Sequence, residues 1–351
     1  MPSILFLDSK KSIGRLLDLC ELEKLHSLDY YGERYYGNSP IKLLQYDLVV
    51  QSHFTNLTHQ DLIFQCKENN IPTLFIFDGI FDWANTYENP KHGKLNLYIG
   101  KPFLHDFVFS VSGGNALNYL KFKNKDSSFI KYIPERNIMY KHKGEDEIKF
   151  ASRTILITTA NTAYFDDREY DNLVVLINKI RNICLQEEIS IVYRIFDEKL
   201  KSDLIIDNGD NFVDCKFSDV LAHVDLVMST PSTINIDVIN NELPLCTLIY
   251  RNSPMLNTGG WIVYDDRSAK DALHQILDCD NDVDYIERLN YQKSLVSSES
   301  EPLDTLFKSD TYKTIQNDKN ILIKKIKDYS VFSHFKLLIS LLIHALKTLK
   351  K

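Results

Sequence analysis

The chain has 351 residues, which exceeds what one hydrophobic core usually supports, so we expect two domains. Its formal net charge of −7 argues against nucleic acid as a partner, because no basic surface is implied. Its six cysteines are scattered without a Cys-x-x-Cys spacing, which indicates buried thiols in a reducing cytosol and argues against disulfides or a zinc site.

Strand and helix patterns alternate along the first half of the chain. The first apolar run, Ile4–Leu7, follows the N-terminus without a charged leader or cleavage site, so we expect a protein that is not secreted. Further apolar runs predict strands at Tyr46–Val50, Thr73–Phe77 and Phe107–Val111, and Leu57–Asn69 has its apolar positions at helical spacing. This alternation predicts a parallel sheet with helices on its faces.

Three residues that follow these strands are candidates for acid–base chemistry. Asp78 ends the most apolar strand and precedes Gly79, so its carboxylate could act as a base or as a nucleophile, although Asp-Gly is also a common turn. Asp82 is the second candidate. His53, after Val49-Val50, is the third, since a neutral imidazole is a competent base. After the fourth strand, a loop of Gly113, Gly114 and Asn115 could allow a close approach of an acceptor.

The second half of the chain restarts the same pattern after a charged segment at Lys141–Phe150, which we interpret as a linker. Tyr170–Gln186 reads as an amphipathic helix, and strands are predicted at Thr154–Thr158, Ile189–Tyr193, Asp225–Met228, Leu245–Ile249 and Trp261–Tyr264. Two successive β/α series predict an α/β protein with two facing Rossmann-like, doubly wound domains. We place the acceptor-side domain at residues 1–148, the donor domain at 149–300 and C-terminal helices at 301–351.

Residues 225–244 are the most informative segment of the chain. A short strand is followed by the hydroxyls of Ser229, Thr230, Ser232 and Thr233 and then by a helix, so these side chains could cap the first helical turn. Free amides at that helix end favour an anion, and Asp237, one turn later, could take a ribose diol. The alternative is a capped helix in an ordinary α/β domain.

Residues after the other strands of this domain could converge on the same anion. Thr159 and Asn161 lie in a small, hydrogen-bonding loop, and Arg194 and Arg251 follow two further strands. Together with the Ser-Thr segment they indicate an anionic nucleotide ligand. Each arginine could alternatively be a surface charge at a strand end.

We expect no metal ion. The only acidic run of interest, at residues 278–284, follows a helix and lacks an apolar strand after it, which is typical of a solvated loop. The helix end, the hydroxyls and the arginines could neutralise a leaving phosphate instead.

The C-terminal segment Val331–Lys351 is apolar with lysines at both ends. Its uninterrupted apolar part is about ten residues, well short of the roughly 20 that span a bilayer. We expect an amphipathic helix that either contacts an anionic membrane surface or packs back across the first domain.

The pattern Ser232-Thr233, three residues, Asp237, six residues and Pro244 resembles the donor-binding segment of GT-B glycosyltransferases. The chain departs from that family at three places. Asp237-Val238 stands where the family has Glu-Ala, and Asn241-Glu242 stands where it has a small turn with Gly. After Arg194 the chain has Ile195-Phe196, where the family has His-Pro. Loosely, over most of its length, it is most similar to bacterial Kdo and sialyl transferases, which use CMP-activated acidic sugars.

This resemblance implies a role for each candidate. Thr159 and Asn161 would approach the donor phosphates, Ser229, Ser232 and Thr233 would hold phosphate, and Asp237 would take the ribose. Arg194 or Arg251 would bind a phosphate or a sugar carboxylate, and Asp78 would be the base of an inverting reaction or the nucleophile of a retaining one.

The implied activity is metal-independent transfer of a sugar to a glycan or lipid-linked glycan of capsule, O-antigen or lipopolysaccharide, at the cytoplasmic face of a membrane. A UDP-sugar or CDP-glycerol donor is the first alternative. A non-catalytic nucleotide-binding relative, which the missing His-Pro favours, is the second.

Overall fold

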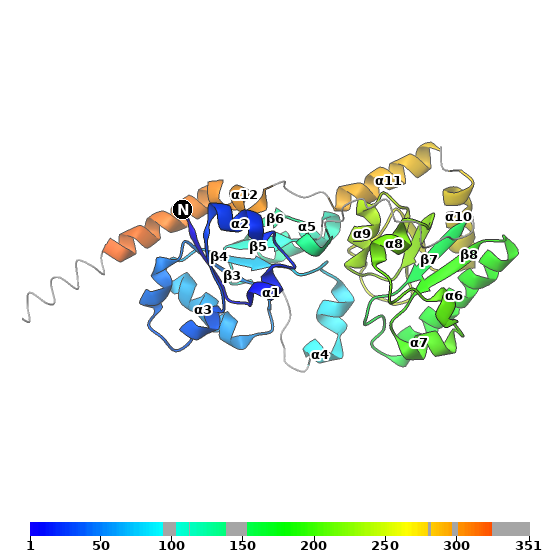
Figure 1. Ribbon diagram of the computed structural model, residues 1–351, viewed down its shortest axis with the longest axis horizontal. Helices are drawn as coiled ribbons and strands as arrows, with labels where there is room; N and C mark the ends of the chain where they lie inside the picture. The colour runs from blue at the N-terminus through cyan, green and yellow to red at the C-terminus, as the bar shows by residue number, and fades with distance from the viewer. Residues whose placement is uncertain (94–102, 112, 138–152, 280–281, 297–300, 325–351) are drawn as a thin grey trace, which may run out of the picture.

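The computed structural model describes residues 1–93, 103–111, 113–137, 153–279, 282–296 and 301–324. Two α/β units lie side by side, and each has a parallel sheet between layers of helices (Figure 1). The predicted fold class is therefore confirmed. The predicted linker at 141–150 and the C-terminal segment at 331–351 lie outside the described residues.

The first sheet has six strands in the order β2-β1-β3-β4-β5-β6, and every pairing is parallel. Its strands are β1 (Ser3–Phe6), β2 (Ser27–Asp29), β3 (Leu48–Gln51), β4 (Thr73–Ile76), β5 (Phe107–Ser110) and β6 (Ser128–Lys131). Its helices are α1 (Lys10–Ile13), α2 (Leu19–Leu25), α3 (Leu57–Glu68), α4 (Pro90–Gly93) and α5 (Gly114–Lys123), with shorter helical turns η1 (Gly32–Tyr35), η2 (Pro40–Gln45), η3 (Ala84–Glu88) and η4 (Glu135–Asn137).

The second sheet has five strands in the order β11-β10-β9-β7-β8, again all parallel. Its strands are β7 (Thr154–Thr158), β8 (Ser190–Arg194), β9 (Leu226–Ser229), β10 (Leu245–Leu248) and β11 (Trp261–Val263). The helices that follow β7 are α6 (Asp167–Gln186), α7 (Glu198–Asp203), α8 (Phe217–Leu221), α9 (Ile234–Asn240), α10 (Asp266–Leu277), α11 (Val283–Leu295) and α12 (Pro302–Lys308), with the turn η5 (Asn208–Asp210).

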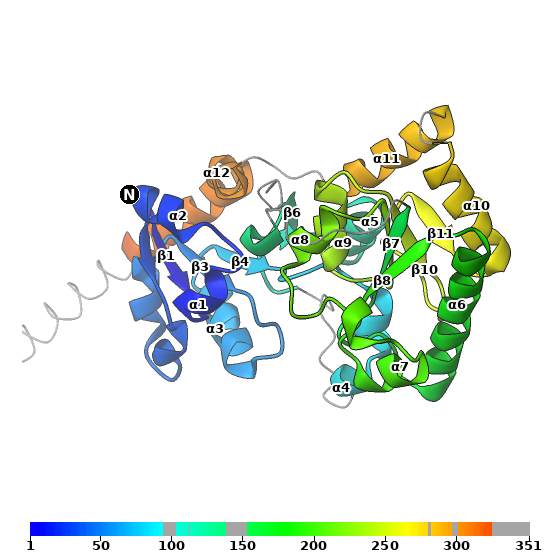
Figure 2. The ribbon, with the colours of Figure 1, turned by 45° about the vertical axis from the view of Figure 1, so that its right-hand side comes forward.

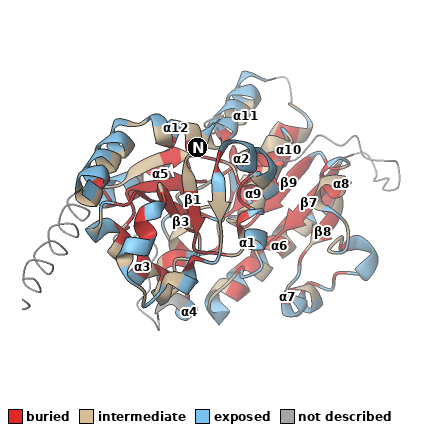
Figure 3. Cartoon of the chain, turned by 60° about the vertical axis from the view of Figure 1, so that its left-hand side comes forward, coloured by how far each residue is buried: buried red, intermediate tan, exposed pale blue. Residues whose placement is uncertain are grey.

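Apolar residues cover both faces of each sheet, which explains why its strands read as continuous apolar runs (Figure 3). In β1 and just after it, Ile4 and Phe6 join one core cluster while Leu5 and Leu7 join the cluster on the opposite face. The second sheet is divided in the same way between two clusters. Because side chains alternate along a strand, this double burial fixes the orientation of the residues at the strand ends.

The chain returns to the first domain after α11. Residues 310–324 are helical, and Leu322 and Ile323 pack against the core cluster on one face of the first sheet. Figure 2 shows α8 and α9 on the side of the second domain that is turned toward the first. Ile236 of α9 is 2% exposed and belongs to a core cluster of the first domain, so the two domains share apolar contacts.

Candidate functional site

Each sheet has one point at which the order of its strands reverses. In the first sheet this point lies between β1 and β3, and in the second between β7 and β9. The loops after the two strands diverge there and leave a crevice at their carboxyl ends, which is where open parallel sheets bind ligands. Both crevices are therefore expected to carry functional side chains.

In the first crevice, His53 after β3 forms a hydrogen-bonded pair with Asp8 after β1. Its Nδ1 lies 2.5 Å from Asp8 Oδ1, and Ser52 donates to Asp8 Oδ2 from its amide at 2.8 Å and from its hydroxyl at 2.9 Å. The Asp8 side chain is 4% exposed, whereas that of His53 is 60% exposed. A carboxylate that accepts Nδ1–H holds the tautomer in which Nε2 is the base, so this ring can take up a proton.

A cavity of about 190 Å³ opens beside this pair. Its lining combines aromatic residues with hydroxyls, and its charged residues come from four segments of the first domain. The aromatic residues are Phe54, Phe75 and Phe77, the hydroxyls are those of Ser12, Ser52 and Thr55, and the titratable side chains are Arg15, His53, Asp78 and Arg136. Two of the three predicted acid–base candidates, His53 and Asp78, thus share one cavity.

Asp82, the third candidate, lies elsewhere. Its carboxylate accepts from the Asn85 amide at 2.9 Å and lies 3.9 Å from Arg251 of the second domain. Burial raises the pKa of this carboxyl above its usual range. Asp82 is therefore part of the contact between the domains, and it does not line the cavity that holds His53.

Three predicted donor-binding residues have buried polar atoms without a hydrogen-bond partner among the described residues: Thr159 Oγ1 and Arg194 Nε, at the second crevice, and Arg251 Nε. Thr159 follows Thr158, which pairs with Arg194 across β7 and β8. The Arg194 guanidinium lies 4.7 Å from the ring centre of Phe196, and burial lowers its pKa. A buried polar group without a partner needs an explanation, and a bound water molecule or a ligand would each supply one. Asn161 is exposed on the same loop.

The Ser-Thr segment makes contacts that the sequence did not predict. Ser229 Oγ donates to the Thr230 carbonyl at 2.8 Å, so it faces the protein interior. Thr230 Oγ1 accepts from the Ala160 amide at 2.7 Å and thereby joins the loops after β9 and β7. Ser232 Oγ lies 3.5 Å from the Ile234 amide.

The prediction that Thr233 caps the following helix is wrong. Thr233 has a helical backbone conformation and makes no side-chain cap bond to α9, which has seven residues. Its Oγ1 accepts instead from the Ile80 amide of the first domain at 3.2 Å. The hydroxyl is therefore used for contact between the domains.

Asp237 is also engaged across the domain boundary. Its Oδ1 accepts from Asn137 Nδ2 at 2.9 Å, and the Asn137 carbonyl accepts from Asn240 at 3.1 Å. Burial raises the pKa of Asp237 to about 6, and the hydrogen bond from Asn137 and the charges of Arg136 and Arg194 oppose that shift. Asp237 therefore joins α9 to the first domain through Asn137.

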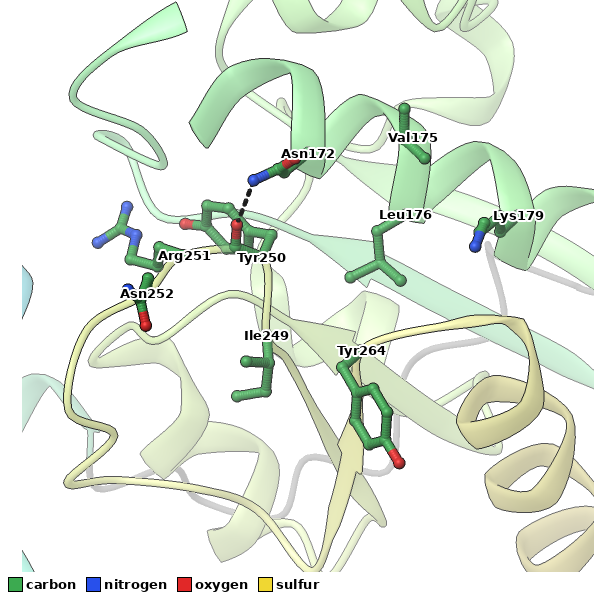
Figure 4. A pocket seen from close by; sticks show the side chains of 9 residues that line it. All are labelled: Asn172, Val175, Leu176, Lys179, Ile249, Tyr250, Arg251, Asn252 and Tyr264. Atoms are coloured by element: carbon green, nitrogen blue, oxygen red, sulfur yellow. Dashed lines mark hydrogen bonds between the residues drawn. The ribbon is translucent and has the colours of Figure 1, made fainter. Parts of the chain in front are cut away.

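Arg251 lies at the edge of a second, open cavity of about 340 Å³, between the N-terminal half of α6 and the ends of β10 and β11 (Figure 4). Its side chain is 5% exposed. It lies 3.6 Å from Glu169 of its own domain and 3.9 Å from Asp82 of the other. Arg251 thus bridges the domains, and of the predicted donor-binding residues it is the one that lines this cavity.

The predicted acceptor loop packs against the second domain. A Cβ on Gly113 would lie 2.5 Å from the Leu295 carbonyl oxygen of α11, and Gly114 has a φ of +50°. This contact explains why glycine stands at both positions. Asn115 is exposed beside them, and the acceptor role of the three residues stays a prediction.

Sequence reasoning missed Asp8, Arg15 and Arg136. Asp8 stands directly after the first strand, so the rule that singled out Asp78 would also have found it. The two arginines follow no predicted strand end. They meet because the Arg136 amide donates to the Arg15 carbonyl at 3.1 Å, between segments that are far apart in the chain.

Two searches of the described residues gave no result. No group of three or more His, Cys, Asp or Glu side chains in this part of the chain could hold a metal ion. No helix within it is both long and apolar enough to cross a membrane.

Comparison with solved structures supports the fold. The chain is similar to S. aureus MnaA in a co-structure with UDP (14% identity, 90% of this chain and 97% of that chain, TM-score 0.54). It is also similar to a candidate UDP-N-acetylglucosamine 2-epimerase of Listeria monocytogenes (10% identity, 87% of this chain and 94% of that chain, TM-score 0.56). A third similar structure is the Methanocaldococcus jannaschii UDP-GlcNAc 2-epimerase in complex with UDP-GlcNAc and UDP (12% identity, 79% of this chain and 93% of that chain, TM-score 0.50).

These likenesses extend over both domains, and the architecture is that of the GT-B fold. No protein-family model and no curated protein matches the chain.

Proposed function

We propose that this protein is a glycosyltransferase that uses a nucleotide sugar, with His53 as the base that activates the acceptor hydroxyl. The observation that carries the proposal is the Asp8–His53 pair at the first crevice, opposite a second crevice with unpartnered polar groups on Thr159 and Arg194. Asp237 connects the two domains through its hydrogen bond from Asn137, and the charges of Arg136 and Arg194 both oppose the rise of its pKa.

The first domain supplies the proton transfer. Asp8 accepts from Nδ1 of His53 and is itself held by Ser52, so the ring keeps one orientation. Its Nε2 can then take the proton of an acceptor hydroxyl bound in the adjoining cavity as that oxygen attacks the anomeric carbon. Asp78 lines the same cavity and is the second candidate base, or the nucleophile if the reaction retains configuration.

The second domain supplies the donor site. Arg194 and Thr159 would bind the phosphate of the donor, and the guanidinium would stabilise the charge that develops on the leaving nucleotide. Asp237 would contact the ribose once the bond to Asn137 is released. Ser229 is left out of this proposal because its hydroxyl already donates to a backbone carbonyl inside the protein.

For the nucleotide we propose UDP. Two of the similar structures are named for UDP or UDP-GlcNAc, and their likeness covers both domains. The resemblance to transferases that use CMP-activated acidic sugars is loose over most of the chain and specific only in the segment of residues 225–244. CMP is therefore the competing prediction for the same site.

The test is a thermal melt of the protein with UDP, CMP, CDP and GDP. A ligand at a hundred times its dissociation constant should add about 2.7 kcal/mol to the free energy of unfolding. Arg194→Gln should abolish the shift, whereas Arg168→Gln, at an exposed position of α6, should keep it. Stabilisation by CMP alone would replace UDP by CMP, and no shift with any nucleotide at millimolar concentration would reject the donor site.

Epimerisation of a nucleotide sugar is a second candidate, because two of the similar structures are named for UDP-GlcNAc 2-epimerase activity. Incubation with UDP-GlcNAc and no acceptor separates the two candidates. An epimerase would produce the 2-epimer by itself, whereas a transferase would release UDP in proportion to an added acceptor.

A further inference from the structure

We infer that the first-domain cavity takes an anionic acceptor, whose carboxylate or phosphate is held by Arg15 and Arg136 beside the hydroxyl that His53 deprotonates. This inference rests on the proposed function for the reaction, but not for the binding of the anion. The cavity of about 190 Å³ has room for about six water molecules at ~30 Å³ each. That is space for one sugar-sized group.

The two guanidinium groups enter this cavity from adjacent backbone segments. The Arg136 amide donates to the Arg15 carbonyl at 3.1 Å, and the preceding Glu135 amide donates to the Leu16 carbonyl at 3.0 Å. This pairing holds residues 15–16 beside residues 135–136. Both arginine side chains line the cavity and both residues are exposed, so a ligand from solvent can reach them.

Neither guanidinium forms an ion pair with a carboxylate of the described residues. Arg136 donates to the backbone carbonyl of Asp78, which uses one of its five N–H groups. Arg15 has no side-chain hydrogen bond within the same part of the chain. The two side chains therefore offer most of their donors to a bound anion, in the planar geometry that suits carboxylates and phosphates.

The charges that face the cavity favour an anion. Asp8 is turned inward, because its oxygens accept from Ser52 and His53. The remaining carboxylate on the lining is that of Asp78, against the two guanidinium groups.

The binding test uses the whole protein without nucleotide. Isothermal titration with glucuronate, inorganic phosphate and glucose compares one carboxylate, one phosphate and one neutral sugar. We expect glucuronate or phosphate to bind at least tenfold more tightly than glucose, and Arg15→Gln to remove that difference. Arg15→Lys should restore part of it, and the exposed control Arg168→Gln should leave it unchanged.

The outcomes separate the sources of the anion. Tight binding of glucuronate alone identifies an acidic sugar as the acceptor, and tight binding of phosphate alone identifies a phosphorylated one. Equal binding of glucose and both anions overturns the inference, as does anion binding that Arg15→Gln and Arg136→Gln leave intact. A melting curve for each variant shows that it is folded.

The same proteins distinguish this inference from the proposed function. If UDP or CMP stabilises the protein and no anion binds, the function stands and the acceptor class is wrong. If the anions bind through Arg15 and no nucleotide does, the transferase proposal fails and the cavity remains an anion site. With active enzyme, Arg15→Gln should raise the KM for an anionic acceptor at least tenfold, with a much smaller effect on a neutral acceptor.

Discussion

Gly79 and Thr233 meet where the two domains touch, and there is no room between them for a side chain on Gly79. A Cβ at this position would lie 2.2 Å from Thr233 Oγ1, the same oxygen that accepts from the Ile80 amide at 3.2 Å. The loop after β4 and the loop after β9 therefore pack so closely that no methyl group fits between them at Gly79. Since these loops also carry Asp78 and the Ser-Thr segment, this contact sets how the two crevices face one another.

We expect Gly79→Ala to weaken this contact by about 1–3 kcal/mol, as overpacking usually does. Thr233→Ala removes the clashing oxygen, so the double variant should be more stable than the sum of the single changes predicts. Urea unfolding of the four proteins measures this coupling. Additive effects would mean that the two loops move apart at little cost.

The Asp8–His53 pair predicts a catalytic effect without a matching loss of donor binding. His53→Gln should lower kcat by about 10²–10⁴, the range for loss of a positioned general base. Asp8→Asn should lower it as well, because the ring loses its orienting acceptor, and the double variant should be little worse than His53→Gln alone.

Ser52→Ala is the matched control for this pair. It removes one hydroxyl donor from Asp8 and the contact of that hydroxyl with His53 Nδ1 at 3.2 Å, but it leaves the Asp8–His53 bond and the amide donor of residue 52 in place. It should therefore keep most of the activity. Full activity of His53→Gln would transfer the role of the base to Asp78, and the same kinetic measurements on Asp78→Asn would then test that assignment.

The raised pKa of Asp237 predicts that the free energy of unfolding falls as the pH rises. Its pKa is raised to about 6 in the folded protein from an ordinary value of 3.8. Below that ordinary value the carboxyl is protonated in both states and carries no penalty. Between the two values the unfolded chain ionises first, and above about 6 the full penalty of about 3 kcal/mol is present.

Asp237→Asn should remove this pH dependence. The amide oxygen of the new side chain can still accept from Asn137, so the contact between the domains is kept. Relative to wild type, the free energy of unfolding of the variant should rise by about 3 kcal/mol between pH 4 and pH 7. If the free energies of unfolding of the two proteins differed by a constant amount over that range, the Asp237 carboxylate would be solvated in the folded protein.

The sequence predicted the parts of this fold that are buried on both faces. Thr154–Thr158 was predicted with the bounds that β7 has, because all five residues are buried and the apolar pattern is continuous. The edge strands β2 and β6 were missed since they are short and half exposed, so burial leaves no apolar run to recognise. Residues 310–324 return to the first domain through long-range contacts that no local pattern encodes.

The candidate site was predictable from the sequence only where its residues follow buried strands. His53 and Asp78 could be found because each follows a buried strand, and they do share a cavity. The use of Thr233 could not be found, because its partner Ile80 lies 153 positions away in the chain. The position of Thr233 just before a helix favoured a helix cap, but in the structure its hydroxyl accepts from an amide of the other domain.

Lys319 should hold the returning C-terminal helix on the first domain. Its side chain is 4% exposed, and its ammonium donates to the Tyr46 carbonyl at 2.6 Å and lies 3.5 Å from Asp47 Oδ1. Burial lowers its pKa, and the Asp47 carboxylate opposes that shift. Lys319→Met fills similar space but removes the donor of the Tyr46 carbonyl and the partner of Asp47 Oδ1, while Ser3 still donates to Asp47 Oδ2.

The expected cost of Lys319→Met is about 1–3 kcal/mol, which is the penalty for a buried polar group that loses its partner. Lys313→Met, on an exposed turn of the same helix, removes a cation that lies 3.4 Å from Asp310 and should change stability by less than about 0.5 kcal/mol. Urea unfolding compares the two variants, and limited proteolysis shows whether the helix detaches. Equal stability of both variants would mean that Leu322 and Ile323 hold the helix by apolar contact alone.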